Sequence, residues 1–247
     1  MKDNFSTGSD LYAKYRPTYP QELFDALLAH ISNKKLALDV GTGNGQVAEQ
    51  LAKYFEKVYA TDISNEQIKQ AQPNEKIEYS VQSAEKTNFE NNTFDLIVVA
   101  QAVHWFDFES FYTEIDRILK KNGVFAMWGY GLIRTFPELD KIIDDFYYNQ
   151  IGKYWDAERK HIDDAYQNIP FPFKKAQVFN FEKKILWNLE YLIGYLNTWS
   201  AVKHYEKQNG KNPVQAIENE LKQAIAQKES FEVTFPIFMK VGEMPKN

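Results

Sequence analysis

Three glycines at alternate positions form the clearest chemical signal in the chain. Gly41, Gly43 and Gly45 follow an apolar run, and Asp39 stands two residues before the first of them. Glycine lets the backbone turn sharply and approach a ligand without a Cβ in the way, and a helix that starts here points its amino end at that ligand. The spacing is G-x-G-x-G rather than the G-x-G-x-x-G of dinucleotide-binding folds. We therefore predict a small-ligand site in preference to a plain strand-to-helix turn.

Two further polar positions stand where a doubly wound sheet places side chains against a nucleoside. Asp62 lies at the end of the second expected strand, where a carboxylate accepts hydrogen bonds from both ribose hydroxyls. The alternative is a cap for the helix that begins near Ser64. Residues 83–85, which include Ala84 and Glu85, follow the third expected strand, where an adenine edge would lie. The alternative there is a surface loop.

The spacing of apolar residues predicts the scaffold that positions these groups. Short apolar runs indicate buried strands, and stripes with helical period indicate amphipathic helices between them. We expect strands over 36–40, 57–62, 77–81, 94–100 and 124–128. We expect helices over 46–55 and 107–120, and a further helix that starts at Ser64. This alternation predicts an α/β, Rossmann-like, doubly wound sheet.

The C-terminal half departs from this alternation. Two late strands, 175–187 and 231–240, with a helix over 189–205 between them, would complete a seven-stranded sheet that is mostly parallel with an antiparallel last strand. Residues 131–173 are rich in aromatic side chains, and we expect them to form a helical cover over the carboxyl edge of the sheet. Because no Gly- and Ser-rich linker divides the chain, we expect residues 1–247 to form a single domain.

Composition argues against several classes of partner and site. The chain has 247 residues, with 29 Lys and Arg against 34 Asp and Glu, and this net charge of −5 disfavours binding to nucleic-acid phosphates. It has no Cys, and its four His show no i, i+4 pairing, so we expect no disulfide and no metal site. No stretch approaches the ~20 apolar residues of a membrane span, and the start lacks a signal-peptide core, so we expect a cytoplasmic protein.

In their order along the chain, these segments resemble a known family. The chain resembles the class I S-adenosylmethionine-dependent methyltransferases in LDVGTGNGQV, ATDIS, QSAEKTNF and FDLIVVAQAVHWFD. Within that family it is similar to the small-molecule branch related to trans-aconitate methyltransferase, in YAKYRPTYP near the start, AQAVHWFD, and LNTWSAVKHY near the end. The resemblance covers nearly the whole chain and implies S-adenosyl-L-methionine as cofactor. That cofactor has no phosphate, which agrees with the departure from G-x-G-x-x-G.

The family pattern, laid over this chain, implies roles for single residues. The methionine end of the cofactor would be held by Asp39, Gly41, Thr42, Gly43 and Gly45. Asp62 would bind the ribose hydroxyls, and Ile63 would pack on the adenine, with Ala84 and Glu85 at the adenine edge. The methionine and sulfonium region would be lined by Gln101 and Ala102.

His104 and Trp105 follow at the mouth of the expected site. His104 is the candidate general base, with a packing histidine as the alternative. A carboxylate acceptor needs no base, whereas an alcohol or phenol needs one with a pKa near the working pH. Trp105, and Trp199 on a C-terminal helix, are candidates for walls of the acceptor pocket, with core packing as the alternative.

Residues 1–19 are expected to form an N-terminal arm that carries Tyr12, Tyr15 and Arg16. Together with the cover, this arm would close over the site and exclude water. Arg16 could pair with a carboxylate on the cofactor or the substrate, and the alternative is a surface arginine.

The sequence leaves other functions and partners to compare. A nicotinamide-dependent oxidoreductase is disfavoured by the glycine spacing and by the lack of a Tyr-x-x-x-Lys pair in the late segments. A non-catalytic partner protein with a methyltransferase fold is a third reading. We expect a methyltransferase that acts in line on a small molecule, a carboxylic acid or other oxygen nucleophile, as a monomer or homodimer without nucleic-acid or membrane partners.

Overall fold

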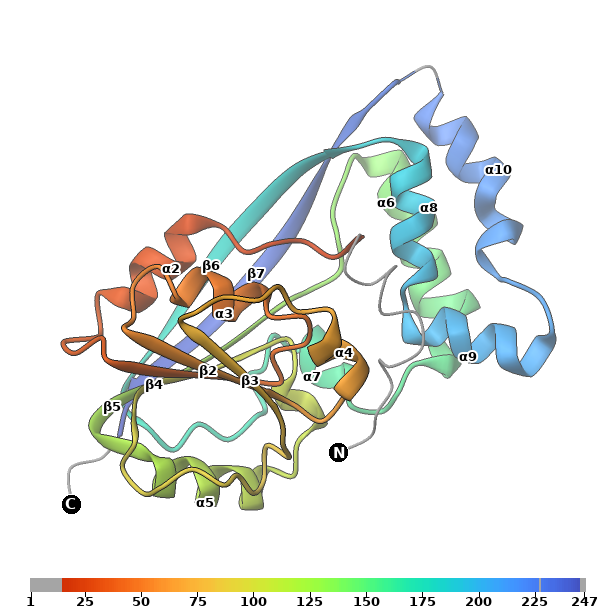
Figure 1. Ribbon diagram of the computed structural model, residues 1–247. Coiled ribbons are helices and arrows are strands. Elements are labelled where there is room, and N and C mark those ends of the chain that lie inside the picture. Colours follow the sequence, from red (N-terminus) through yellow and green to blue (C-terminus); the bar gives the residue numbers. More distant parts are fainter. Residues whose placement is uncertain (1–14, 227, 245–247) are drawn as a thin grey trace.

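A seven-stranded sheet forms the centre of the molecule (Figure 1). The computed structural model describes residues 15–226 and 228–244. The strands are β1 (Leu36–Val40), β2 (Lys57–Asp62), β3 (Ile77–Val81), β4 (Phe94–Ala100), β5 (Leu119–Tyr130), β6 (Lys174–Trp187) and β7 (Phe231–Glu243). Their order across the sheet is β3-β2-β1-β4-β5-β7-β6. β7 runs antiparallel to both β5 and β6, whereas the pairs from β3 to β5 are parallel. The predicted α/β fold with an antiparallel last strand is confirmed.

Helices cover both faces of the parallel part of the sheet, which explains why its strands are so apolar. In β4, the residues from Phe94 to Val99 are all buried, as expected of a parallel strand between two helical layers. α2 (Gln21–Leu28) and α3 (Gln46–Leu51) lie on one face, and α5 (Phe108–Ile118) lies on the other (Figure 1). The fold therefore brings the carboxyl ends of β1, β2, β4 and β5 to one edge.

Short polar side chains start the helices next to that edge. The Ser64 hydroxyl accepts a hydrogen bond from the backbone N–H of Gln67 at 3.3 Å and caps α4 (Asn65–Lys69), the helix predicted from Ser64. The Asp107 carboxylate does the same for α5 through the N–H of Ser110 at 2.9 Å.

Several predicted helix boundaries are wrong. The helix predicted over 107–120 ends at Ile118, because Leu119 is extended, buried and paired with Phe94 of β4. β5 is accordingly longer than predicted. The helix predicted over 46–55 ends at Leu51.

The helix predicted over 189–205 is in fact two helices, α8 (Leu189–Asn197) and α9 (Ser200–Asn209). Trp199 separates them in an extended conformation with φ −70° and ψ 135°. Its buried ring packs with Tyr147, Trp155 and Tyr195, and this packing outweighs the helical period of the sequence.

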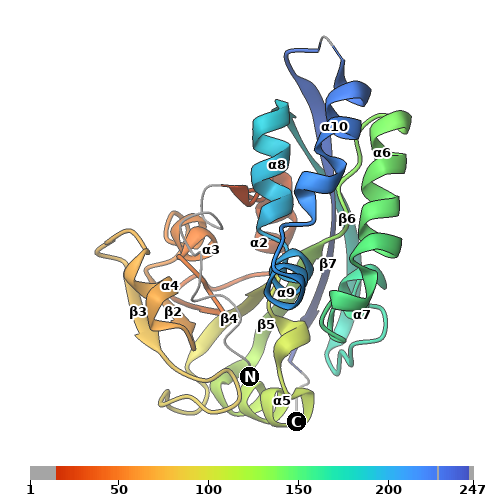
Figure 2. The same ribbon diagram turned by 90° about the vertical axis from the view of Figure 1, so that its right-hand side faces the viewer.

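The helical cover extends beyond residues 131–173. After β5 come α6 (Pro137–Asp144), a π-helical turn (Asp145–Gln150), a 3-10 turn (Gly152–Tyr154) and α7 (Arg159–Asp163). α10 (Val214–Ile225) packs on both α6 and α8. Figure 2 shows α6, α8 and α10 as one layer beside the outer parts of β6 and β7. Among the described residues, no helix combines the length and apolar character needed to cross a membrane.

Candidate active site

A cavity of about 850 Å³ opens at the carboxyl ends of β1, β2, β4 and β5. We call it the cofactor cavity. Its lining includes ten residues singled out from the sequence, namely Arg16, Asp39, Gly41, Thr42, Gly43, Asp62, Ile63, Gln101, Ala102 and Trp105. Pro17, Tyr19, Ser64, Gln67, Ala100 and Tyr130 are among the other lining residues. Residues from five separate segments of the chain thus meet at one edge of the sheet.

The glycine turn has the left-handed backbone that its composition predicts. Gly41, Gly43 and Gly45 have φ values of +69°, +58° and +88°. A Cβ on Gly41 would lie 2.7 Å from the Cβ of Ala102, so the turn and the end of β4 approach as closely as their backbones permit. Gly45 does not line the cavity. It precedes α3 and lies against the Tyr79 ring, where a Cβ would clash with that side chain.

Asp39 is a strongly perturbed titratable group of the cofactor cavity. Its side chain is fully buried, and burial raises the pKa of the carboxyl to about 7. Hydrogen bonds lower the pKa by less, including the one that Thr42 Oγ1 donates to Oδ2 at 2.5 Å. The other oxygen, Oδ1, is buried and has no hydrogen-bond partner. A buried acceptor of this kind is costly unless a ligand supplies a donor.

Asp62 joins the glycine turn to the start of α4. Its Oδ2 accepts from the N–H of Gly43 and its Oδ1 accepts from the N–H of Ser64, each at 2.9 Å. The helix-capping alternative is therefore present in the structure, and the same carboxylate also lines the cavity. Ionised carboxylates have about four acceptor positions, so the two roles are compatible.

Gln101 is held in an unusual backbone conformation with φ +54°. Its side-chain amide pairs with the backbone of Tyr130: Oε1 accepts from the Tyr130 N–H at 2.8 Å and Nε2 donates to the Tyr130 carbonyl at 3.4 Å. The amide thus extends the β4–β5 ladder past its last strand residues. This arrangement fixes Tyr130 in the cavity wall.

Ala84 and Glu85 are not brought to the cavity. Ala84 is buried in the apolar cluster beneath α5, and a carboxylate oxygen of Glu85 accepts from the N–H of Asp107 at 3.2 Å. The other Glu85 oxygen accepts from the Ser83 hydroxyl. These contacts do not test whether Ala84 and Glu85 lie at the adenine edge of a bound cofactor, and that role stays a prediction.

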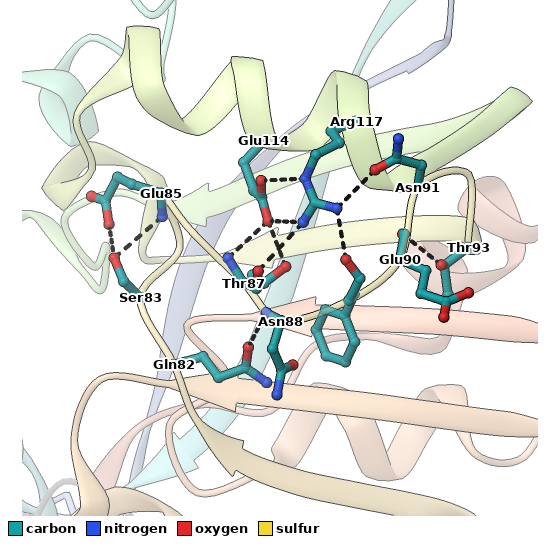
Figure 3. A network of polar contacts seen from close by, with 11 residues as sticks. Gln82, Ser83, Glu85, Thr87, Asn88, Glu90, Asn91, Thr93, Glu114 and Arg117 are labelled. Carbon is teal, nitrogen blue, oxygen red and sulfur yellow. Dashed lines mark hydrogen bonds and ion pairs between the residues drawn. The ribbon is translucent and has the colours of Figure 1, made fainter.

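A charged network holds this loop against α5 (Figure 3). Arg117 donates to both oxygens of Glu114, through Nε at 2.9 Å and Nη2 at 2.7 Å, and to the carbonyl of Phe89 at 2.7 Å. Glu114 accepts in turn from the backbone N–H of Thr87 at 2.8 Å and from its hydroxyl at 2.5 Å. Burial opposes ionisation of Glu114, but these hydrogen bonds outweigh it and hold the pKa below its ordinary value.

A second cavity, of about 460 Å³, adjoins the first. We call it the acceptor cavity. Three residues, Arg16, Gln101 and Trp105, line both cavities and form the boundary between them. The remaining lining residues are His104, Trp155, Asp156, Arg159, Thr198 and Ser200. Most come from the cover and the C-terminal helices, so this cavity forms where the cover meets the sheet.

Two guanidinium groups line the acceptor cavity, and one of them, Arg159, also forms an ion pair, with its Nε 3.6 Å from Asp163 Oδ1. Arg159 Nε donates to the Tyr147 hydroxyl at 2.6 Å, and the guanidinium lies 4.8 Å from the centre of the Trp155 ring. Arg16 Nη1 donates to the Tyr130 hydroxyl at 2.7 Å. The carboxylate of the cavity, Asp156, accepts from the Ser200 hydroxyl at 3.0 Å.

His104 lies in the acceptor cavity and is almost entirely buried, at 6% exposure. Its Nδ1 lies 2.9 Å from the Tyr166 hydroxyl. Burial lowers the pKa of its imidazole to about 3, helped by the nearby charge of Arg159. The ring is therefore neutral at neutral pH, and a base this weak is poorly matched to proton abstraction.

The remaining predicted residues lie around the two cavities. Tyr15 is buried against α8 and lines neither cavity. Trp199 also lines neither, since its ring packs in the aromatic cluster of the cover, which is the core-packing alternative. Tyr12 lies outside the described residues.

Comparisons with known proteins agree with this arrangement. A family model described as a methyltransferase domain matches residues 38–127. A "Putative methyltransferase" of Dictyostelium discoideum is 35% identical to this chain, over 96% of it and 93% of that protein. A solved structure, of a "Putative Type II Methyltransferase" from Anaeromyxobacter dehalogenans, superposes with a TM-score of 0.86 at 36% identity, over 94% of this chain and all of that one. The "Probable S-adenosylmethionine-dependent methyltransferase CRG1" of Saccharomyces cerevisiae is 23% identical, over 66% of this chain and 60% of its own length.

The chain belongs to the class I S-adenosylmethionine-dependent methyltransferases.

The donor set of the cofactor cavity fits S-adenosylmethionine in this methyltransferase. Asp39 offers a buried acceptor that suits an ammonium group, and Asp62 offers a carboxylate at the end of β2. The glycine turn lets the backbone approach a ligand closely. Among residues 15–226 and 228–244, no group of three or more His, Asp or Glu side chains could hold a metal ion.

Sequence reasoning missed several residues of the methyltransferase's cavities. Tyr130 ends β5, and a search for polar groups at the carboxyl end of every strand would have found it. Ser64 and Gln67, which pair at the start of α4, also line the cofactor cavity. Asp156 and Arg159 carried no local signal, because the adjacent sequence does not distinguish a charged side chain that packing covers from one at the surface.

Proposed function

We propose that this methyltransferase transfers the methyl group of S-adenosylmethionine to a carboxylate oxygen of a small molecule in the acceptor cavity. One observation carries the proposal: the cavity that adjoins the cofactor cavity contains two arginines, Arg16 and Arg159, and one carboxylate, Asp156. A guanidinium has five N–H donors, and the Nε of Arg159 is the one that faces the Tyr147 hydroxyl and Asp163. The planar fork of arginine suits a carboxylate.

The state of His104 supports the same acceptor class. A carboxylate is ionised at neutral pH and attacks without a base, whereas an alcohol or phenol must lose a proton. With a pKa of about 3, His104 is a weak acceptor for that proton. The general-base role of His104 thus stays a prediction, and a packing and polar-wall role agrees better with its burial. The resemblance to the branch of trans-aconitate methyltransferase also supports an acid as acceptor.

The chain's own residues have two tasks in such a reaction. S-adenosylmethionine supplies an electrophilic methyl group on a positively charged sulfur. Trp105 and Gln101 at the boundary of the cavities would fix the direction of attack, and Arg16 and Arg159 would hold the acceptor. Alignment of this kind can supply about 7–11 kcal/mol in favourable cases. The cover and the segment that starts at Tyr15 would exclude water from the reaction. This proposal includes the predicted organisation of the chain as a single domain with an N-terminal arm and a cover.

The test is a methyl-transfer screen across small carboxylic acids, phenols and amines, with detection of base-labile methyl esters. We expect carboxylates to be methylated, with little change in kcat between pH 6 and 8. Arg159→Gln should raise KM for the acid at least tenfold, about 1.4 kcal/mol or more, because it removes a charged hydrogen-bond donor. Arg134→Gln is the matched control, since Arg134 pairs with Asp144 and lines neither cavity.

Methylation of phenols or amines, with none of any acid, would contradict the proposed acceptor class. Sedimentation analysis of the purified protein separately tests the predicted monomer or homodimer.

A further inference from the structure

Gly194 lies in the middle of α8, where a glycine needs an explanation. Glycine in a helix interior destabilises by about 1 kcal/mol relative to alanine. The backbone of Gly194 is not in the left-handed region, so no turn requires a glycine at this position. Such a glycine usually has a packing or functional reason.

The reason is the ring of Tyr15. A Cβ on Gly194 would overlap the edge of that ring, with Cε2 only 2.8 Å away and two other ring carbons closer still. The ring also packs edge-on against Tyr191, three residues earlier on α8, with centroids 4.9 Å apart. Tyr15 is 8% exposed in this position. Gly194 therefore leaves a notch on the face of α8 that the Tyr15 ring fills.

The residues that follow Tyr15 reach both cavities. The Arg16 guanidinium lies 5.4 Å from the centre of the Tyr195 ring, one residue past the notch, and 5.9 Å from that of Tyr130. Arg16 lines both cavities, while Pro17 and Tyr19 line the cofactor cavity. Arg16, Pro17 and Tyr19 follow Tyr15 by one, two and four residues. Because the chain between them is this short, the position of Tyr15 limits where they can lie.

We propose that Gly194 is a positioning residue for methyl transfer: it seats Tyr15 on α8 and so places Arg16, Pro17 and Tyr19 around the cofactor. Gly194 itself lines neither cavity. The expected change in S-adenosylhomocysteine affinity depends only on the chain being a methyltransferase. The effect on the acceptor side rests on the proposed function.

The first measurement is the affinity for S-adenosylhomocysteine by titration calorimetry, together with a thermal melt. Gly194→Ala should weaken binding roughly tenfold, equivalent to about 1.4 kcal/mol. Its melting temperature should change little, because the helical preference of alanine opposes the lost burial of the Tyr15 ring. A merely structural glycine would instead change stability and leave affinity intact. Gly152→Ala is the matched control, since its added methyl group would meet only an ordinary contact, 3.7 Å from the Tyr147 carbonyl.

A double-mutant cycle tests the pairing directly. Tyr15→Ala should weaken S-adenosylhomocysteine binding to the same extent as Gly194→Ala, and Tyr15→Phe should keep most of it because the ring remains. In the Tyr15→Ala background, Gly194→Ala should have no further effect, since the ring that it displaces is gone. Hydrogen exchange of residues 15–19 in the presence of S-adenosylhomocysteine should rise in Gly194→Ala and not in Gly152→Ala.

Two results would overturn the proposal: wild-type affinity in Gly194→Ala, or effects of Gly194→Ala and Tyr15→Ala that simply add. Both measurements need no methyl acceptor, so they are independent of the acceptor class. If the screen finds no methylated acid, the proposed function is contradicted and the result of the double-mutant cycle still holds. If the cycle shows no coupling between Tyr15 and Gly194, the result of the screen still holds.

Discussion

Asp39 makes cofactor binding depend on pH in a direction that the structure fixes. The unfolded chain has an Asp pKa of about 3.8, and burial raises the pKa in the folded protein to about 7. The folded state thus binds more protons between these pH values. The stability associated with the protonated group is fully present below about pH 4 and is lost as the pH rises to about 7. Above pH 7, keeping the buried carboxylate ionised costs about 4 kcal/mol, from three pKa units at 1.36 kcal/mol each.

An ammonium group beside Asp39 should reverse this shift. The cation would supply the donor that Oδ1 lacks and would favour the ionised carboxylate. If the bound state has a pKa well below 6, binding at pH 6 releases close to one proton, and binding at pH 8 releases about a tenth of one. The dissociation constant for S-adenosylhomocysteine should then be about tenfold higher at pH 6 than at pH 8.

Titration calorimetry in two buffers with different ionisation enthalpies measures both quantities. Asp39→Asn is the control, because an amide of the same shape does not titrate. This variant should bind S-adenosylhomocysteine weakly at every pH and without pH dependence. It should also be more stable than wild type, by a larger margin at pH 8 than at pH 5. Equal affinities at pH 6 and pH 8 in the wild type, or the same pH dependence in Asp39→Asn, would refute the reasoning.

Three other predictions follow from the geometry. Asp62→Ala should weaken S-adenosylmethionine binding by about 1.5–3 kcal/mol, the scale of hydrogen bonds to a charged group, and a wild-type affinity in calorimetry would remove the ribose assignment. Glu114→Gln should lower the free energy of unfolding in urea by about 1–3 kcal/mol at pH 7, because it breaks the pair with Arg117. The pKa of Glu114 is held low, so the stability that its ionised form contributes is present above its ordinary pKa and is lost as the pH falls. The difference in unfolding free energy between Glu114→Gln and wild type should therefore shrink toward pH 3. An equal difference at pH 7 and pH 3 would contradict this role of the carboxylate. Hydrogen exchange at residues 15–19 should slow when S-adenosylhomocysteine is added, with a smaller change in β4, and an arm that exchanges equally fast with and without ligand would contradict the lid.

Local patterns were enough to predict many of the residues that line the cofactor cavity. The glycine turn, Asp62 and Gln101 each stand at the end of an apolar run, and parallel strands necessarily bring such ends to one edge. The contacts of the loop after β3 could not be predicted in this way. Ala84 is buried in the apolar cluster and Glu85 accepts from the N–H of Asp107 at the start of α5, and their contact with the adenine edge stays a prediction. Helix ends near Leu119 and Trp199 were misplaced because burial of those side chains outweighed helical period.

By itself the sequence determined the sheet, its antiparallel last strand and the cofactor edge, because these depend on periodicity and on glycine, which act over a few residues. Only the tertiary structure decided which residues line the acceptor cavity. Arg16, the neighbours Asp156 and Arg159, and Ser200 come from three segments that are far apart in the chain. The tertiary structure also decided what surrounds each titratable group. Burial and the approach of Arg159 make His104 a weak base, and burial makes Asp39 a weak acid. A pKa depends on the solvent and charges within a few ångströms of a group, and those neighbours are set by packing rather than by adjacent letters of the sequence.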